Sequence, residues 1–314
     1  MKPASRLGGS APDLSPELDR VITTLRDARA RADDADCAAG GTLPAIQPLT
    51  SAMEATIRAL FPAHLGPPGL DLTGTDSFVR ETLQRALDIL FEQVRHELRW
   101  NARCAGNRDA DVEGNATEIA RRFLSSLPDV RLLLQSDVAA AYRGDPAARS
   151  VEEVLICYPG VKAVVYHRLA HALHELGTPL IARMIAEVAH SATGVDIHPG
   201  ARIGGSFFID HGTGVVIGET AVIGERVRLY QAVTLGSRRF AVDADGALVK
   251  GAPRHPIVED DVVIYAGATI LGRITIGRGS IVGGNVWVTR SLPAGSTISQ
   301  AQSRSEVFEA GGGI

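Results

Sequence analysis

Cysteine is scarce in this chain, and its placement excludes two classes of site. Only three of the 314 residues are cysteines, Cys37, Cys104 and Cys157, and no two of them form a CxxC pair. Disulfide frameworks and zinc sites need closely patterned sets, so an odd number of widely spaced residues indicates reduced thiols. We therefore expect neither a disulfide scaffold nor a bound metal.

Long apolar runs are also missing. A membrane-spanning helix needs roughly 18 or more consecutive apolar residues, and no stretch of this sequence reaches that length. The first twenty residues lack the apolar core of a secretion signal. We expect a cytoplasmic protein with no membrane partner.

The chain has no strong charge of one sign. Its net charge is −4, and it contains no long basic run. Proteins that neutralise a phosphate backbone are usually basic, so we expect no nucleic-acid partner. The 45% hydrophobic and 22% charged content is that of a soluble globular protein, and the length suggests two domains.

Glycine, in contrast, is abundant and unevenly placed. Of the 33 glycines, 12 lie in residues 1–190 and 21 in residues 191–314. An average protein has roughly 7% glycine, so the excess belongs to the last two-fifths of the chain. The sequence therefore predicts two different architectures.

The first architecture is helical. Residues 1–14 are expected to be a tail, and Ser15-Pro16 reads as the start of a first helix. Apolar residues at helical spacing follow in 78–98, 115–126 and 127–190, with a Gly-Asp-Pro turn at 144–146. We expect a helical N-terminal domain over residues 15–192.

At Val195 the periodicity changes from helical to a period of six. Small or aliphatic residues recur four positions after most members of this series, and glycine often follows a member directly. The series consists of Ile197, Ile203, Ile209, Ile217, Ile223, Leu229, Leu235, Val258, Ile264, Ile270, Ile276, Val282 and Val288.

A six-residue period indicates a solenoid in which each hexapeptide forms one short strand and one corner of a triangular coil. The aliphatic residue points to the axis, and glycine turns the corner without steric cost. The sequence thus predicts an α+β protein whose N-terminal all-helical domain precedes a parallel β-helix over residues 193–292. A loop over 237–253 and a tail over 293–314 complete the expected organisation.

The solenoid sequence resembles one group of the hexapeptide-repeat acyltransferase family, the serine O-acetyltransferases. The resemblance covers residues 136–292, and residues 1–130 carry no matching motif. It implies that the β-helix is left-handed and that the protein transfers acetyl from acetyl-CoA to L-serine, the first step of cysteine biosynthesis. The motifs are TGVDIHPGARIGGSFFIDHGTGVVIGETAVIGERVRLYQAVTLG at 193–236, RHP at 254–256 and YAGATILG at 265–272.

Acetyl transfer to a hydroxyl needs a base that accepts the alcohol proton. His211 follows Ile209 where the period slips by two residues, so its side chain is expected to project outward. On residue type alone an ordinary surface histidine is the favoured alternative. The resemblance implies that His211 is the general base, that Asp196 orients it, and that His255 is a second active-site histidine. We read His198 as structural.

The resemblance also implies how the substrate is held. Asp145 and Asp210 correspond to the carboxylates that bind the ammonium group of serine, and Arg254 to the group that pairs with its carboxylate. A guanidinium suits a planar two-oxygen acceptor. Glu219 either supports a residue that contacts the substrate, without touching the substrate itself, or is a solvated corner residue.

The resemblance implies acetyl-CoA as the co-substrate and no metal. Coenzyme A leaves little trace in the sequence itself, which contains no Walker-type or GxGxxG loop. The resemblance implies that its pantetheine lies in a groove between adjacent subunits, against backbone at Gly236, Ser237, Ala266 and Gly284. The same residues are also ordinary corner residues of a solenoid.

The resemblance implies a homotrimer or a dimer of trimers. It further implies that Ile314, after Gly311–Gly313, binds O-acetylserine sulfhydrylase (cysteine synthase), although a frayed tail is the alternative. Two other functions stay open: an acetyltransferase for homoserine or a sugar, and a non-catalytic scaffold for the sulfhydrylase.

Overall fold

The computed structural model describes residues 13–31, 42–239, 243 and 245–300 of the chain. Two compact units are present, one of Met1–Thr42 with Arg99–Ala110 and one of Leu43–Leu98 with Asp111–Ile314. The first unit contains α1 (Ser15–Arg31). The predicted partner-binding residue Ile314 and the glycines before it lie outside the described residues.

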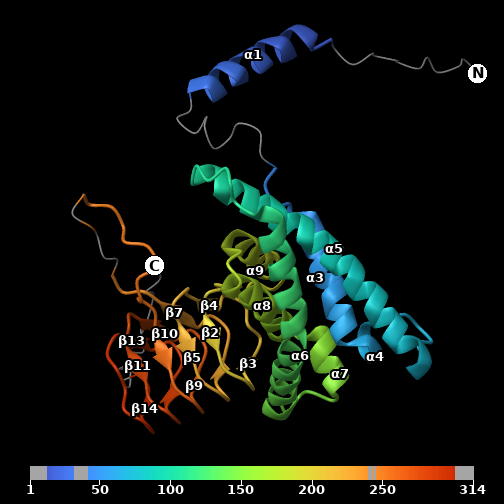
Figure 1. The fold of residues 1–314 in the computed structure, drawn as a ribbon. Helices are drawn as coiled ribbons and strands as arrows, with labels where there is room; N and C mark the ends of the chain where they lie inside the picture. Colours follow the sequence, from blue (N-terminus) through green and yellow to red (C-terminus); the bar gives the residue numbers. More distant parts are fainter. Residues whose placement is uncertain (1–12, 32–41, 240–242, 244, 301–314) are drawn as a thin grey trace, which may run out of the picture. The chain divides into compact units, whose positions relative to one another are not determined.

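The second unit begins with helices (Figure 1). Residues that prefer helix starts mark several boundaries: Asp111 accepts a hydrogen bond from the backbone N–H of Gly114, and Ser150 accepts one from Glu153. The helices are α3 (Ile46–Leu60), α4 (Pro62–Leu65), α5 (Leu72–Cys104, whose last turn belongs to the first unit), α6 (Val112–Gly144), α7 (Val151–Cys157), α8 (Pro159–Glu175) and α9 (Pro179–Thr193).

A solenoid of parallel strands follows the helices, as the six-residue period predicts. All thirteen aliphatic residues of the predicted series are buried, none more than 8% exposed. The strands are β1 (Asp196–Ile197), β2 (Arg202–Ile203), β3 (Phe208–Ile209), β4 (Val216–Ile217), β5 (Val222–Ile223), β6 (Arg228–Leu229), β7 (Thr234–Gly236), β8 (Ile257–Val258), β9 (Val263–Ile264), β10 (Thr269–Leu271), β11 (Thr275–Ile276), β12 (Ile281–Val282), β13 (Trp287–Val288) and β14 (Thr297–Ile298).

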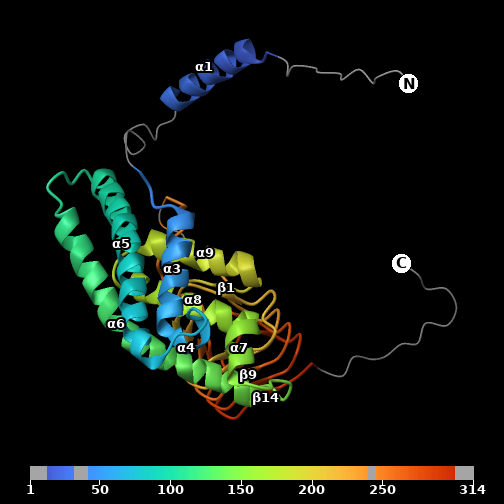
Figure 2. The same ribbon diagram turned by 90° about the vertical axis from the view of Figure 1, so that its right-hand side faces the viewer.

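Three parallel sheets form the faces of the solenoid. Sheet 1 has the order β1-β4-β7-β10-β13, sheet 2 the order β11-β8-β5-β2, and sheet 3 the order β14-β12-β9-β6-β3. The chain visits the sheets in the order 1, 2, 3, so each coil has three corners (Figure 2). Strand β14 lies beyond residue 292, the expected end of the solenoid.

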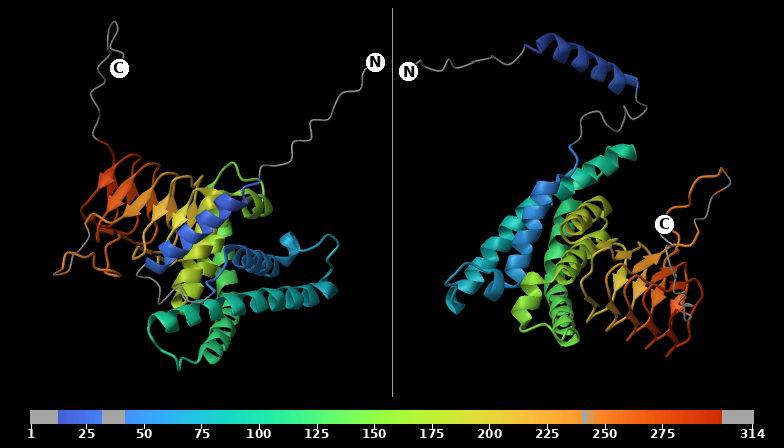
Figure 3. Two further views of the ribbon diagram at one scale, coloured as in Figure 1. Left: turned by 90° about the horizontal axis from the view of Figure 1, so that it is seen from above. Right: turned by 180° about the vertical axis from the view of Figure 1, so that it is seen from behind.

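The helices pack on the first coil of the solenoid. Helix α9 contacts β1, and α6 and α8 both contact β3 (Figure 3). A buried ion pair joins the layers: Arg168 of α8 pairs with Asp137 of α6 at 3.1 Å and also donates to the carbonyl of Gly204. Because a buried charge needs a partner, this network fixes the first coil against the helices.

Candidate active site

His211 lies in a tight turn between β3 and β4, at the corner that joins sheet 3 to sheet 1. We call this corner, Asp210–Gly214, the His211 corner. The N–H of Gly212 donates to the carbonyl of Asp210 at 2.7 Å, and His211 between them has a φ of 59°. This is a γ-turn with positive φ, an uncommon and strained conformation for a residue with a side chain. It directs the exposed imidazole away from the solenoid.

Asp145 belongs to the same surroundings, because its charge and that of His211 interact. Its Oδ2 accepts a 2.5 Å hydrogen bond from the Tyr158 hydroxyl, and its Oδ1 accepts one from the N–H of Ala147. These hydrogen bonds, the one from Tyr158 first, hold the pKa of Asp145 below its ordinary value. The same bond raises the pKa of Tyr158 to about 12, so the phenol stays a donor.

Asp210 is buried and paired with Arg228. The guanidinium lies 2.9 Å from Oδ2 of Asp210, and its central carbon lies 5.0 Å from the ring centre of Phe208 and 4.7 Å from that of Tyr230. Contact with both aromatic rings fixes the guanidinium and, through it, the carboxylate. Arg228 is therefore a positioning residue for Asp210.

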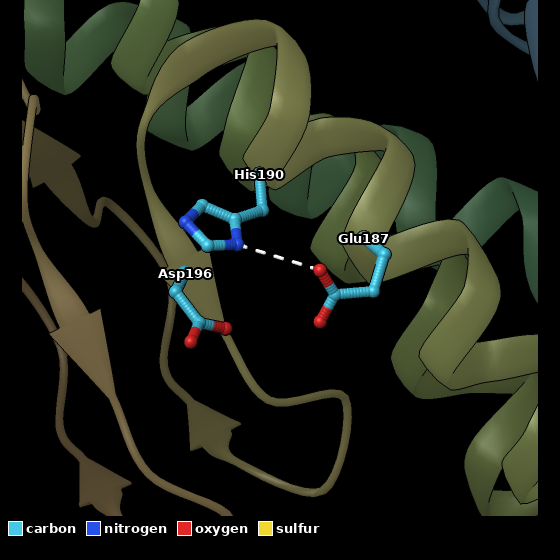
Figure 4. Close-up of side chains that lie close together, drawn as sticks. All are labelled: Glu187, His190 and Asp196. Atoms are coloured by element: carbon cyan, nitrogen blue, oxygen red, sulfur yellow. Dashed lines mark hydrogen bonds and ion pairs between the residues drawn. The ribbon is translucent and has the colours of Figure 1, made fainter.

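Asp196 does not hydrogen-bond or ion-pair with His211 in the described structure. Its carboxylate instead faces His190 and Glu187 of α9, as Figure 4 shows, with Arg183 3.9 Å away. These three side chains form a ligand set for a cation. Arg183, however, also hydrogen-bonds Glu187, so a guanidinium already neutralises the cluster, and we assign no metal to it.

Arg254 lies at the corner that joins sheet 1 to sheet 2, which we call the Arg254 corner (Gly218–Thr220 and Pro253–His255). Its guanidinium pairs with Glu219 at 2.6 Å, and its backbone N–H donates to the Thr220 hydroxyl. Burial raises the pKa of Glu219, but the hydrogen bond and the charge of Arg254, together with the charges of His198 and His255, lower it by more, so the pKa lies below its ordinary value. Glu219 thus supports Arg254 directly.

His255 is buried in the same corner and uncharged at neutral pH. Burial, and then the charge of Arg254, lower its pKa to about 4. The backbone N–H of Thr220 donates to Nδ1 of His255 at 3.0 Å, so the ring proton must be on Nε2. A Cβ on Gly218 would lie 2.0 Å from the ring, so only glycine leaves room for it. His255 can therefore donate a hydrogen bond from a fixed position.

One chain does not bring these two groups together. The His211 and Arg254 corners lie at opposite ends of the sheet 1 strands. One face of the solenoid separates them, a distance on the order of 15–20 Å, the length of one extended hexapeptide. The predicted cofactor residues divide in the same way. Gly236 ends β7 and Ser237 follows it, on the side of the Arg254 corner, whereas Ala266 and Gly284 precede β10 and β13 at the other end of the sheet 1 strands.

Sequence reasoning missed two residues that hold the carboxylates of Asp145 and Asp210, namely Tyr158 and Arg228. Arg228 occupies an outward position of a hexapeptide, directly before Leu229 of the inward series, and an arginine there resembles any solvated residue. Tyr158 lies before the Pro159-Gly160 break, which marks a helix start but not a contact with Asp145. Neither role has a local sequence signal.

The solenoid is similar to those of known proteins. Residues 255–290 match the family model for the bacterial transferase hexapeptide (six repeats). A protein of Synechococcus elongatus named "Serine acetyltransferase, plasmid" is 58% identical over 275 residues, which are 87% of this chain and 86% of the relative.

Two solved structures extend the comparison. The serine acetyltransferase isoform 3 of Entamoeba histolytica, in complex with cysteine, has a TM-score of 0.68 and 32% identity over 94% of this chain and 96% of that chain. The Neisseria gonorrhoeae enzyme in complex with serine has a TM-score of 0.52 and 29% identity over 82% of this chain and 96% of that chain. The predicted fold class, including the left-handed β-helix, is confirmed.

No helix in the described ranges is both long enough and apolar enough to span a membrane.

Proposed function

The chain belongs to the serine acetyltransferase family, and we propose that it transfers the acetyl group of acetyl-CoA to the hydroxyl of L-serine with His211 as the general base. The products are O-acetyl-L-serine and CoA. The observation that carries this proposal is the exposed His211 directly after the fixed Asp210, with Asp145 near enough to interact electrostatically with the imidazole. These residues match the needs of a hydroxyl acceptor that carries an ammonium group.

His211 moves the proton in both halves of the reaction. Its imidazole accepts the serine hydroxyl proton as the oxygen attacks the thioester carbonyl carbon. The tetrahedral intermediate then loses the thiolate of CoA as the C–S bond breaks, and the imidazolium returns the proton to sulfur. A base exposed at a strained turn suits this role, because both substrates must reach it.

Asp196 is the proposed partner that orients His211. The supporting observation is backbone proximity: the N–H of Gly214 donates to the carbonyl of Gly194 at 2.8 Å, and the N–H of Asp196 donates to the carbonyl of Val215 at 2.9 Å. A change of side-chain rotamer away from His190 would bring its carboxylate toward the imidazole. An acceptor there fixes the tautomer in which the other ring nitrogen is the base.

Both charged ends of serine have proposed sites. Asp145 and Asp210 attract the ammonium group, and the guanidinium of Arg254 pairs with the carboxylate. His255, neutral and protonated on Nε2, adds a hydrogen-bond donor beside Arg254. A sugar acceptor has neither charged end and would leave these groups unused.

A complete site needs the His211 corner of one chain and the Arg254 corner of another. An interface between two different corners of the same protein is heterologous, and it closes into a ring when the rotation permits. Three prisms around a threefold axis satisfy this geometry, so the proposed assembly is a homotrimer. The same interface would bring together the predicted acetyl-CoA residues, which lie at the two ends of the sheet 1 strands.

Cysteine biosynthesis also requires a sulfhydrylase that consumes O-acetylserine, and the proposed contact to it is Ile314. Three preceding glycines would let the isoleucine and its carboxylate enter a pocket of the partner. Deletion of Ile314 is expected to abolish co-purification with the sulfhydrylase while acetylation continues. Unchanged co-purification would contradict this contact.

The activity is tested by measuring thiol release from acetyl-CoA with L-serine, L-homoserine and sugars as acceptors. We expect release that depends on L-serine and is lost by at least 100-fold in the His211→Ala variant, since general-base catalysis contributes about 10²–10⁴-fold. Release independent of serine, or full activity of the variant, would rule out the proposal.

A further inference from the structure

A cavity among the helices of the second unit contains no residue of the proposed active site. It has a volume of about 430 Å³ and is lined by residues of α3, α4, α7 and α8 (Figure 2). Small-molecule sites occupy about 300–1,000 Å³, so the cavity is large enough for a ligand. We call it the helical pocket. Its apolar lining consists of Ile57, Leu65, Leu155, Ile156 and Val165.

The polar side chains that line the helical pocket have no partners in the described chain. Glu54 and Arg58 lie four residues apart on α3, a spacing at which opposite charges can pair, yet neither side chain forms an ion pair or a hydrogen bond. The side chains of Lys162 and Tyr166 on α8 likewise bond to no other described residue. Charges of both signs and one hydroxyl are therefore available to a bound molecule.

Tyr166 gives the clearest indication of a ligand, because it is buried and its hydroxyl is unused. Only 4% of the residue is exposed, and it belongs to the core of the helical region. Buried polar groups nearly always have a hydrogen-bond partner. Burial, and then the charge of Glu54, raise the pKa of Tyr166, so the phenol keeps its proton. An acceptor on a molecule in the cavity would satisfy this donor.

The lining defines the chemical class of the ligand. The carboxylate of Glu54 suits an ammonium group, whereas Arg58 and Lys162 suit a carboxylate. The five aliphatic side chains suit a large apolar group, which gains free energy by leaving water. L-serine carries only a hydroxymethyl group and would leave the apolar wall uncovered. The pocket therefore fits a zwitterionic amino acid with a large aliphatic side chain.

The helical pocket adjoins the junction between α7 and α8, which positions the substrate-binding residues. Its lining includes Ile156 of α7 and Lys162 of α8. Between them lie Tyr158, whose hydroxyl donates to Asp145 at 2.5 Å, and Gly160, which packs against the end of β3. A molecule that contacts both helices therefore restrains the segment that holds Asp145.

We propose that the helical pocket is a regulatory site for a zwitterionic amino acid with a large aliphatic side chain, and that its occupant strengthens the binding of L-serine. The occupant restrains the junction between α7 and α8, and Tyr158 then keeps Asp145 in place for the ammonium group of the substrate. This coupling rests on the proposed function, whereas binding to the pocket does not.

Calorimetry without acetyl-CoA tests the site. The probe is L-leucine, compared with 4-methylpentanoate, which lacks the ammonium group, and 3-methylbutylamine, which lacks the carboxylate. We expect the wild-type protein to bind L-leucine about 10-fold more tightly than either analogue, because each analogue leaves one charged part of the lining without a partner.

Two variants place the ligand in the helical pocket. Tyr166→Phe keeps the ring and removes the hydroxyl, so it should bind L-leucine about 5-fold more weakly, and Lys162→Ala should bind it about 10-fold more weakly. The control is Arg122→Ala, which removes an exposed arginine from α6 and should bind L-leucine as wild type does.

Steady-state kinetics tests the coupling. A concentration of L-leucine that saturates wild type should lower its KM for L-serine about 5-fold, the lower end of common allosteric couplings. The same concentration should lower the KM less in Tyr166→Phe and in Lys162→Ala. In Arg122→Ala it should lower the KM as much as in wild type.

Each other outcome has a distinct meaning. A rise in the KM for L-serine would show that L-leucine competes at the serine site, and it would overturn the proposal. Absent binding of L-leucine, or equal binding by wild type and Tyr166→Phe, would overturn it as well. Binding in the pocket with no change in KM would overturn the coupling. If wild type failed to acetylate serine yet bound L-leucine with these variant effects, the proposed function would fail and the site would stand.

Discussion

Gly160 of α8 lies directly against the backbone carbonyl of Ile209 in β3. A Cβ on Gly160 would be 2.1 Å from that carbonyl oxygen and 3.0 Å from the carbonyl carbon. Ile209 immediately precedes Asp210 and His211. The start of α8 therefore fixes the end of the strand from which the His211 turn begins, and a residue far from His211 in sequence sets its position.

The Gly160→Ala substitution is expected to displace this turn. Alanine is the better helix former by about 0.5–1 kcal/mol, but overpacking against backbone costs about 1–3 kcal/mol, so the clash dominates. We expect kcat to fall at least 10-fold, because a displacement of 1 Å in a site is enough for such a loss. Steady-state kinetics with L-serine and a urea titration measure both effects.

Gly205→Ala is the matched control for that variant. Gly205 lies in the same first coil, and the nearest atoms to a Cβ there belong to the side chains of Ser136 and Leu133, which can move. This variant should keep its kcat within about twofold. A Gly160→Ala enzyme with wild-type kcat would show that α8 does not position His211.

The hydrogen bond from Tyr158 to Asp145 gives a second prediction. In Tyr158→Phe the carboxylate keeps its bond from Ala147 but loses the shorter one, so Asp145 rotates more freely. We expect the KM for L-serine to rise about 5-fold, corresponding to about 1 kcal/mol, with kcat nearly unchanged. The pKa of Asp145 should rise toward its ordinary value.

Tyr142→Phe provides the comparison, since Tyr142 lies on α6 shortly before Asp145, is 39% exposed and has no hydrogen-bond partner among the described residues. Its KM for L-serine should equal that of wild type. An equal rise in both variants, or none in Tyr158→Phe, would mean that Tyr158 does not hold the carboxylate for substrate.

The sequence was sufficient for the solenoid because each hexapeptide repeats one physical requirement. An aliphatic residue must enter the axis at every sixth position, so Ile197 and Val288 follow the same rule although ninety residues separate them. The outward direction of His211 was also predictable, since the two-residue slip breaks the register there. The six-residue repeat therefore made most of the fold predictable.

The family resemblance implies a site between adjacent subunits, but the corner that each residue occupies was not predictable from the repeat in the same way. His211 and Arg254 lie on opposite sides of the 237–253 loop, which interrupts the count of coils and hides which corner each residue occupies. The position of Asp196 beside His190 depends on α9 packing against β1. Contacts between a helix and a strand depend on packing that no repeat encodes.

His167 of α8 gives a prediction about stability and pH. Its ring is buried, neither ring nitrogen has a hydrogen-bond partner among the described residues, and its pKa is held well below 6.5 by burial and by the nearby charge of Arg168. The other titratable groups that face it are His171, His174 and His198. Folding therefore requires His167 to be neutral.

The direction of the effect follows from proton binding. Below pH 6.5 the unfolded chain binds a proton at this histidine that the folded chain excludes. The free energy of unfolding is therefore not reduced by His167 above pH 6.5 and falls as the pH is lowered below that value. The loss is about 1.4 kcal/mol per pH unit for one histidine. Urea titrations of wild type and His167→Leu at pH 7 and pH 5.5 should show a smaller acid loss in the variant; equal losses would contradict this assignment.

The proposed division of the site between two chains gives the last prediction. His211→Ala and Arg254→Ala should each be nearly inactive alone, because every site then lacks either its base or its carboxylate contact. In hybrid trimers from equal co-expression, a site is intact only when one chain supplies His211 and its neighbour supplies Arg254. Random assembly gives that combination with a probability of one half times one half, so we expect about a quarter of the wild-type activity.

Co-expression of His211→Ala with Asp210→Asn is the control. Both changes fall in one corner, so no pairing of chains restores a complete site and the activity should not recover. Recovery in the control, or none in the first mixture, would mean that the two corners do not meet in one active site.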